Sequence, residues 1–358
     1  MKNIKVNLAD NIYHRLQKLK EQNGFGTKSW EEWLKYLVRD VHLVEPLNRQ
    51  VASNTRKLLG VTWMQNLAEN LPYIRNEGKT LRALANEKMV DEPAIIVGAG
   101  PSIYRNNHLK KLGDFRGKIF ATDRMLIPLL ENNVKVDYVA SVDGNAELIP
   151  PFFDNDIVEQ HKDEIKVLLV LQTSPKTLEM CLKRNLDIYW YHTMQDNPNA
   201  EDSSTRSIIY MTMSKKNPLG VPAVPSGGNC GATTLAMAID VFKHKTIGLV
   251  GFDFGYPADC PAEKTSYYST IFSTYNTKTK DTALASAYAT SSFTHYYHPI
   301  FKTEAKSDPV FDGYRASLYE MLENLQRPCK IYNLTMGGTL YNPKLFDCLT
   351  LDEFFNIL

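Results

Sequence analysis

The sequence has few cysteines, and they stand far apart. Its 358 residues include five, Cys181, Cys230, Cys260, Cys329 and Cys348, with no Cys-x-x-Cys pair among them. This spacing argues against a zinc cluster, which needs closely spaced ligands, and for reduced thiols in a cytoplasm. The sequence also lacks a signal-peptide core and any apolar run near the ~20 residues of a membrane span. We therefore expect a soluble, cytoplasmic protein with no transmembrane segment.

An excess of charge of either sign is also missing. The formal net charge is +1, so no global basic field attracts nucleic acid or a membrane surface, and nucleic acid is an unlikely partner. Apolar residues make up 43% of the chain and charged residues 23%, which is typical of a globular protein. The length allows one large core with smaller appendages.

The first segment, residues 1–42, has a pattern of its own. "IKVNL" alternates apolar and polar residues as a strand does, and "NIYHRLQKLKEQ" has helical spacing. After two glycines a second helix is predicted, because Ser29 and Glu32 form a capping-box pattern. This order resembles the ribbon-helix-helix module, which pairs its strand with that of a second chain. The resemblance implies a homodimer through the strand at residues 2–8.

Such modules also bind DNA through the paired strands. Here Asn3, Lys5 and Asn7 would lie on the exposed face of the strand, where base contacts are made. The module carries little net positive charge, which is unfavourable for covering many phosphates. We therefore prefer dimerisation and keep a DNA-binding regulator as an alternative.

Residues 43–92 are predicted to form a helical linker, and residues 93–358 a Rossmann-like domain. In the latter, apolar runs such as "AIIV", "KIFAT", "DYVAS", "KVLLV", "DIYWYH" and "TIGLV" alternate with helix-like segments. This alternation indicates an α/β fold with a mostly parallel sheet and helices on both faces.

Most of these runs end in small or polar residues. The first enters Gly98-Ala99-Gly100-Pro101-Ser102, but the third glycine of a dinucleotide-binding fingerprint is absent. Later strands end at Asp123, Asp143 and Asp253. Because ligands of open α/β sheets bind beyond the carboxyl ends of the strands, we expect these positions to converge on one site.

A second glycine-rich turn, Ser226-Gly227-Gly228-Asn229, immediately precedes a predicted apolar helix. Such a helix start offers unpaired N–H groups and a positive dipole end to a phosphate or carboxylate. The alternative is that Ser226 only caps a core helix.

The order of the motifs resembles a known family. "VGAGPSI", "ATDR", "SVDGN", "PSGGNCGATTLAMAI", "IGLVGFDFGY" and "YNLTMGGTLY" follow one another as in the family called domain of unknown function 115. That family includes motility-associated glycosyltransferases and the archaeal 6-hydroxymethylpterin diphosphokinase. The same order is similar to the sialyltransferases of glycosyltransferase family 42, which use a CMP-activated donor.

The resemblance implies a nucleotide site built from several of these motifs. The residues it assigns to the nucleotide and its phosphates are Gly98, Gly100, Pro101, Ser102, Asp123, Asp143, Ser226, Gly227, Gly228, Asn229 and Asp253. The sialyltransferases have asparagine where Asp123 and Asp143 stand, so the identity of the nucleotide is left open.

The resemblance also implies residues for the chemistry. Tyr256 and either Tyr267 or Tyr268 occupy the stretch where related tyrosines bind the leaving phosphate, although they could instead pack a lid. The family's general base is a histidine in the interval that holds His295 and His298, and the spacing does not decide between them. A histidine suits this role because its ordinary pKa lies near neutrality.

Two enzymatic hypotheses follow from the resemblance. The first is a glycosyltransferase that moves a sugar from a CMP-type donor to a hydroxyl acceptor without a cofactor. The second is a pterin diphosphokinase, in which Asp123, Asp143 or Asp253 would hold Mg²⁺ between phosphate oxygens.

Overall fold

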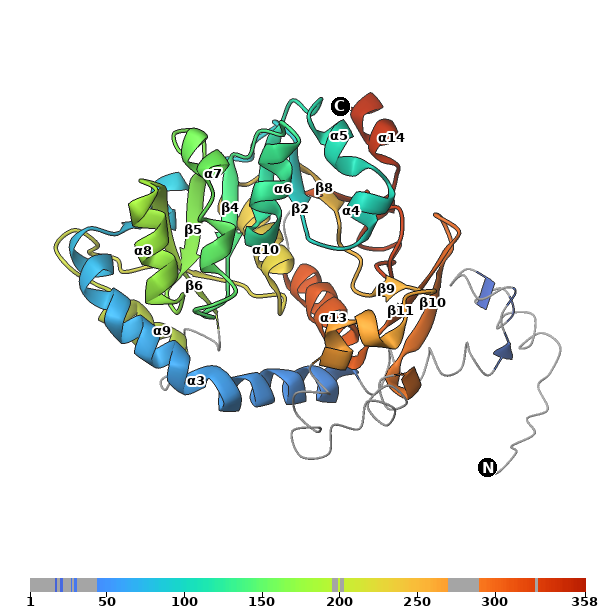
Figure 1. Cartoon of the computed structure of the whole chain (residues 1–358), viewed down its shortest axis with the longest axis horizontal. Helices are drawn as coiled ribbons and strands as arrows, with labels where there is room; N and C mark the ends of the chain where they lie inside the picture. Colours follow the sequence, from blue (N-terminus) through green and yellow to red (C-terminus); the bar gives the residue numbers. More distant parts are fainter. Residues whose placement is uncertain are drawn as a thin grey trace.

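One large parallel sheet forms the centre of the molecule (Figure 1). The computed structural model describes residues 44–194, 203–269, 290–325 and 328–358 and a few isolated positions, with side chains of the first helix described from Leu59 onwards. Within this part the sheet has ten strands in the order β1-β6-β5-β4-β3-β2-β8-β12-β13, and β7 pairs with β6. The strands are β1 (Lys79–Thr80), β2 (Ala94–Val97), β3 (Lys118–Thr122), β4 (Tyr138–Ser141), β5 (Lys166–Val170), β6 (Asp187–Thr193), β7 (Ala223–Val224), β8 (Thr246–Val250), β12 (Lys330–Asn333) and β13 (Asp347–Cys348).

The six apolar runs identified in the sequence form β2, β3, β4, β5, β6 and β8. All four residues of β2 are buried, and they alternate between two hydrophobic clusters, one on each face of the sheet. Ile95 and Val97 belong to one cluster, and Ala94 and Ile96 to the other. Strands buried on both faces read as continuous apolar runs, so the expected Rossmann-like α/β fold is confirmed.

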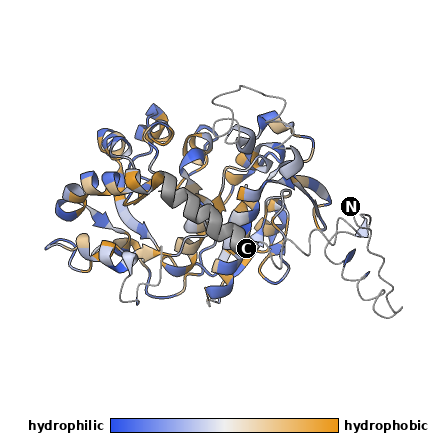
Figure 2. Ribbon diagram, turned by 90° about the horizontal axis from the view of Figure 1, so that it is seen from below, coloured by the Kyte–Doolittle hydropathy of each residue, from blue (hydrophilic) through white to orange (hydrophobic). Residues whose placement is uncertain are grey.

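Helices cover both faces of this sheet. Figure 2 shows that they carry hydrophobic and hydrophilic residues together, as helices with one buried side do. One cluster is covered by α3 (Val44–Asn76), α5 (His108–Leu112), α6 (Leu126–Glu131), α7 (Asp156–Gln160), α8 (Pro175–Lys183), α9 (Ser204–Met211) and α14 (Leu351–Asn356). The other is covered by α10 (Cys230–Asp240) and α13 (Pro309–Asn324). Shorter elements are α4 (Ser102–Arg105), η1 (Leu81–Leu84), η2 (Asp123–Met125), η3 (Pro150–Phe152) and η4 (Ala262–Lys264).

The predicted helical linker, residues 43–92, is part of the sheet domain. Its main element, α3, runs along one side of the molecule from α8 to α13 (Figure 1) and packs against both. The chain then enters β1, which pairs in parallel with β6. Apolar α3 residues such as Leu67 and Ile74 are buried in the main core. The segment is therefore α-helical from Val44 to Asn76, and with β1 it forms part of the sheet domain.

The strand order places a switch point between β2 and β8. From β2 the chain adds β3, β4, β5 and β6 on one side, and it then returns to add β8 and β12 on the other. In such sheets the carboxyl ends of the strands carry the ligand site. We therefore expect the ligand site among the loops that follow β2, β3, β4, β5, β6 and β8.

A small antiparallel sheet, in the order β10-β11-β9, lies beside the large one. Its strands are β9 (Tyr256–Pro257), β10 (Thr294–His298) and β11 (Thr303–Ser307). In the part of the chain that the structure describes, no helix is both long and apolar enough to cross a membrane. The predicted ribbon-helix-helix module and its dimer contact fall outside the described residues, so they stay predictions.

Candidate functional site

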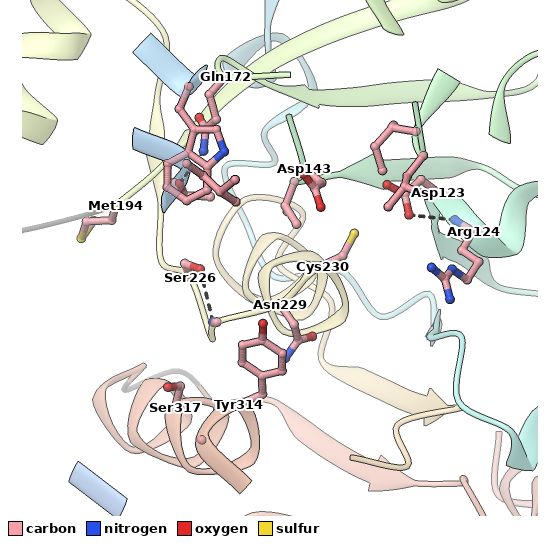
Figure 3. Close-up of a pocket in the computed structure, with 18 of the residues that line it drawn as sticks. Asp123, Arg124, Asp143, Gln172, Met194, Ser226, Asn229, Cys230, Tyr314 and Ser317 are labelled. Carbon is pink, nitrogen blue, oxygen red and sulfur yellow. Dashed lines mark hydrogen bonds between the residues drawn. The ribbon is translucent and has the colours of Figure 1, made fainter. Parts of the chain in front are cut away.

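A cavity of about 600 Å³ opens at the carboxyl edge of the sheet, beside the start of α10 (Figure 3). This size lies in the range of small-molecule sites. Strand ends contribute Asp123, Arg124, Asp143, Gln172 and Thr193, the loop before α10 contributes Ser226, Gly228, Asn229 and Cys230, the segment after β4 contributes Leu148, Ile149 and Phe152, and α3 and α13 contribute Leu59, Trp63, Gly313, Tyr314 and Ser317.

The loop before α10 faces this cavity with its polar groups. Ser226 Oγ accepts a hydrogen bond from the Gly228 N–H at 3.3 Å, and the Asn229 side chain caps the helix by accepting from the Ala232 N–H at 3.0 Å. The first two N–H groups of α10 have no hydrogen-bond partner among the described residues. Unpaired donors at a helix start favour an anion, so this end of α10 fits a phosphate or carboxylate.

Gly227 and Gly228 are glycines for different structural reasons. Gly228 adopts a φ of +85°, a left-handed conformation that favours glycine. Gly227 is buried, and a Cβ there would collide with the Cβ of Ala232. Gly227 therefore allows the loop to pack closely against α10, and it does not line the cavity.

Two carboxylates at the ends of β3 and β4 line the same side of the cavity (Figure 3). Asp123 is buried, and its carboxylate accepts hydrogen bonds from the Arg124 N–H at 2.7 Å and from Ser141 Oγ at 2.6 Å. Burial raises the pKa of Asp123 above its usual range. Asp143 is exposed, and its Oδ1 accepts from the Asn145 N–H at 2.9 Å while Oδ2 has no partner among the described residues. Asp143 is therefore the carboxylate free to act on a ligand.

Arg124 is the one cationic side chain among the described residues that line the cavity. Its guanidinium carbon lies 5.8 Å from the centre of the Phe152 ring, a cation–π distance. Together with the start of α10, Arg124 gives the cavity a second group that attracts anions.

The Gly98–Ser102 turn, in contrast, does not line this cavity. The Gly98 N–H donates to Val250 O at 2.8 Å and the Gly100 N–H donates to Gly251 O at 2.9 Å. A Cβ at either glycine would lie 2.6–2.7 Å from the Gly251 carbonyl oxygen. The two glycines therefore allow the turns after β2 and β8 to pack against each other.

The Asp253 carboxylate accepts hydrogen bonds at the end of this turn. The Ser102 backbone N–H and Oγ both donate to its carboxylate, at 3.2 and 2.6 Å. A protein carboxylate thus stands at the start of α4, next to the half-buried Pro101, where the sequence predicts a bound phosphate. Burial raises the pKa of the Asp253 carboxyl to about 6.

The ring of Phe252 packs against the first turn on one side and against the start of α10 on the other. A Cβ at Gly98 would lie 3.4 Å from this ring and one at Gly231 would lie 3.0 Å from it. The expectation that both turns line one site is therefore not met among the described residues. The second turn lines the cavity with Asp123 and Asp143, whereas the first turn and Asp253 form a packed junction.

The predicted phosphate-binding tyrosines pack near the small sheet. The Tyr256 hydroxyl donates to the Asp308 carboxylate at 2.8 Å and lies 2.8 Å from Ser266 Oγ. Burial, together with Asp308, raises the pKa of Tyr256 above its usual range. Tyr267 and Tyr268 pack against Ala262. None of the three lines the cavity.

The two histidines predicted as a general base lie on β10, and neither lines the cavity. His298 is buried; its Nδ1 accepts from the Phe301 N–H at 3.2 Å, so Nε2–H donates to Leu340 O at 3.1 Å. Burial lowers the pKa of His298 to about 4. Both nitrogens are thus engaged, as in a structural histidine. His295 is exposed on the other side of the strand.

The sequence does not mark the walls that α3 and α13 add to the cavity. Trp63 comes from α3, and Tyr314 and Ser317 come from α13, which packs against α3. Figure 3 shows Tyr314 beside Asn229, with its hydroxyl directed into the cavity. Nothing in the sequence marks this arrangement, because the burial of Asn66 and Asn70 of α3 is seen only in the folded structure.

A metal ion would have few ligands here. No group of three or more His, Cys, Asp or Glu side chains in the described part of the chain could hold one. Mg²⁺ bound with a nucleotide needs only one or two carboxylates, because phosphates and water supply the other ligands. Asp143 fits that need, whereas Asp253 is committed to Ser102.

Comparison with known proteins agrees with this architecture. The MAf glycosyltransferase from Magnetospirillum magneticum AMB-1 superposes with a TM-score of 0.51 over 80% of this chain, at 13% sequence identity. The match covers 38% of that protein, and at this identity it shows a shared fold. No curated protein sequence matches the chain. The family model "6-hydroxymethylpterin diphosphokinase MptE-like" matches residues 65–259, which is more than half of the chain. The chain therefore belongs to the MptE-like family.

Proposed function

We propose that this protein is a transferase that moves a sugar from a nucleotide-activated donor, of the CMP type, to a hydroxyl group of an acceptor. The observation that carries the proposal is the cavity of about 600 Å³ that joins the start of α10 to Arg124 and Asp143. A donor phosphate would bind at the start of α10, where Cys230 lines the cavity and its N–H has no partner among the described residues. The fold that the chain shares with a glycosyltransferase supports the proposal of a sugar transferase.

The reaction needs a group that removes the proton of the acceptor. The acceptor oxygen forms a bond to the anomeric carbon, the bond from that carbon to the phosphate oxygen breaks, and the nucleotide leaves with the electron pair. Asp143 is the proposed base, because its Oδ2 has no partner among the described residues and the residue lines the cavity. Carboxylates perform this role in other glycosyl-transfer chemistry.

A second candidate is pyrophosphoryl transfer, as the name of the family suggests. The observation in its favour is that two aspartates, and no histidine, line the cavity among the described residues. There Asp143 would hold Mg²⁺, which would neutralise charge on the phosphates.

Nucleotide binding separates the two candidates. Thermal-shift titrations with CMP, CDP, ATP and GTP, each with and without Mg²⁺, should show stabilisation by a cytidine nucleotide without metal under the first proposal. A ligand at a hundredfold its Kd adds about 2.7 kcal/mol of stability. Stabilisation by ATP that requires Mg²⁺ would favour the second candidate, and no stabilisation by any nucleotide would refute both.

Turnover tests the assignment of the base. With an active donor in hand, Asp143→Asn should lower kcat by about 10²–10⁴ while the Kd of the nucleotide changes little. Asp163→Asn is the matched control, because Asp163 is exposed and precedes β5 at the opposite edge of the sheet. If Asp143→Asn keeps full turnover, the assignment of Asp143 as the base is wrong.

A further inference from the structure

One wall of the cavity lies outside the part of the chain that the family model matches. Leu59 and Trp63, one helical turn apart on α3, precede the matched residues 65–259, yet both line the cavity. On the same helix, Met64 is 53% exposed and does not line the cavity. The described part of α3 therefore presents one defined face to the site.

Two buried asparagines fix this face. Asn66 Nδ2 donates to Gly144 O and to Gln172 O, both at 3.0 Å, so it ties α3 to the loops after β4 and β5. Asn70, one turn further, donates to Thr173 O at 2.8 Å. Buried side-chain amides bonded to backbone carbonyls hold an element in one position, because breaking them leaves unsatisfied groups. The position of Trp63 is set by these bonds.

Trp63 contributes an aromatic ring to the cavity. A Cβ on Gly144 would lie 3.1 Å from its Cδ1, so the edge of the ring rests on that glycine. Trp63 is partly exposed, and none of the hydrogen bonds among the described residues involves its indole N–H. A large aromatic ring that lines a cavity is suited to stack on a flat ligand group.

Gln172 lines the same cavity, and its carbonyl oxygen and Trp63 Cδ1 both lie beside Gly144. Its side chain lines the cavity although the residue is only 8% exposed, and one end of its amide bonds to Thr193 Oγ1 at 3.4 Å. The other end of the amide has no partner among the described residues. An amide can pair with the edge of a heteroaromatic ring that offers a donor or an acceptor.

We propose that Trp63 and Gln172 form the binding site for a planar heteroaromatic ring of the ligand. Trp63 is the stacking surface, and the Gln172 amide forms hydrogen bonds with the edge of the ring. This inference rests on the proposed function, because it places the phosphate of the same ligand at the start of α10. Nucleobases and pterins share the required chemistry, a flat ring with polar edges.

The experiment uses the tryptophan fluorescence of the full-length protein. Stacking on Trp63 should quench emission when CMP or AMP is added, whereas ribose 5-phosphate, which has no ring system of this kind, should not quench it. Trp63→Phe should bind the nucleotide within about 3-fold of wild type but lose the quenching. Trp63→Leu should bind at least about 10-fold more weakly, in line with the loss of one base–aromatic stack.

Two controls complete the design. Met64→Leu changes the neighbouring exposed position of α3 and should keep both affinity and quenching. Gln172→Leu should weaken CMP and AMP but leave the weak binding of ribose 5-phosphate unchanged. Unfolding temperatures show whether each variant is folded.

The possible results separate this inference from the proposed function. If CMP or AMP binds but Trp63→Leu has wild-type affinity, the ring site is refuted while nucleotide binding stands. If 6-hydroxymethylpterin, and no nucleotide, binds in a Trp63-dependent way, the ring site is supported and the sugar-transfer proposal fails. If neither class of ring compound binds the folded protein, the ring site is refuted.

Discussion

Two glycine-rich turns precede helices in this protein, and they differ in what meets their backbone. After β2, the turn at residues 98–102 gives its N–H groups to Val250, Gly251 and Asp253. Before α10, the turn at residues 226–229 opens on the cavity, and the first N–H groups of the helix have no partner among the described residues. The same sequence feature thus forms a packed junction in one place and a candidate anion site in the other.

The difference lies in the neighbouring strand. β8 lies directly beside β2 and delivers Gly251 and Asp253 to the first turn, so a protein carboxylate takes the position of a ligand anion. A glycine-rich turn alone therefore does not indicate a phosphate site; the residues that follow the adjacent strand decide.

The largest effect should come from filling the packed junction. In Gly100→Ala the new Cβ would meet the Asp253 carboxylate and, at 2.6 Å, the Gly251 carbonyl oxygen. Overpacking of this kind should lower the free energy of unfolding by about 3 kcal/mol, measured by urea denaturation. Gly337→Ala is the control, because its nearest atom would be 3.9 Å away, and it should stay within about 1 kcal/mol of wild type. Equal stability of the two variants would contradict the junction.

Asp253 should make the same junction pH-dependent. Because burial raises the pKa of its carboxyl to about 6, the folded state binds this proton more tightly than the unfolded state. The contribution of Asp253 to stability is therefore fully present below pH ~4 and is lost as the pH rises through about 6. Relative to Asp253→Asn, wild type should lose on the order of 2 kcal/mol between pH 4 and pH 7. A difference between the two proteins that does not vary with pH would exclude this behaviour.

The open turn should instead respond in binding. Gly228→Ala places an L side chain at a φ of +85° and 3.1 Å from the Tyr314 ring, so the turn must shift. We expect the Kd of the nucleotide to rise about tenfold, which corresponds to about 1.4 kcal/mol, in calorimetric titrations. Gly220→Ala, at a φ of +64° away from the cavity, should lose stability but keep wild-type affinity. A rise in Kd for both variants would show a global effect.

The smallest effect should come from helix capping. Asn229 and Asn155 each cap a helix through a side-chain oxygen, on α10 and α7 respectively. Replacing either by alanine should lower the free energy of unfolding by about 1 kcal/mol. Only Asn229→Ala should also weaken nucleotide binding, because Asn155 lies outside the cavity. The comparison fails if the two variants bind alike.

Much of the fold could be predicted from the sequence, because buried parallel strands are continuous apolar runs. The strands β1, β7 and β13 could not, because they are two residues long and exist only through their pairing with neighbours. For the site, Asp123, Asp143 and the turn before α10 could be predicted because each follows or precedes an element whose end is marked in the sequence.

The remaining site residues depend on contacts between distant segments. The role of Asp253 depends on β8 lying beside β2, and the role of Trp63 depends on α3 crossing the sheet edge through Asn66. His298 illustrates the reverse case: its type and interval suggested catalysis, whereas its two nitrogens are bonded to Leu340 and Phe301. One sequence carries no direct record of such contacts.

The difference between the two turns is tested most directly by placing the same negative charge in each. Both positions are exposed: Ser226 lies in the turn before α10, and Ala99 lies in the turn after β2. Ser226→Asp should weaken binding of the tightest nucleotide at least tenfold, because like charges would meet at the start of α10. Ala99→Asp should change the Kd by less than about threefold, because no phosphate binds at that turn in the proposed site. A large loss of affinity in Ala99→Asp with little change in Ser226→Asp would show that the phosphate binds at the first turn and not at the start of α10.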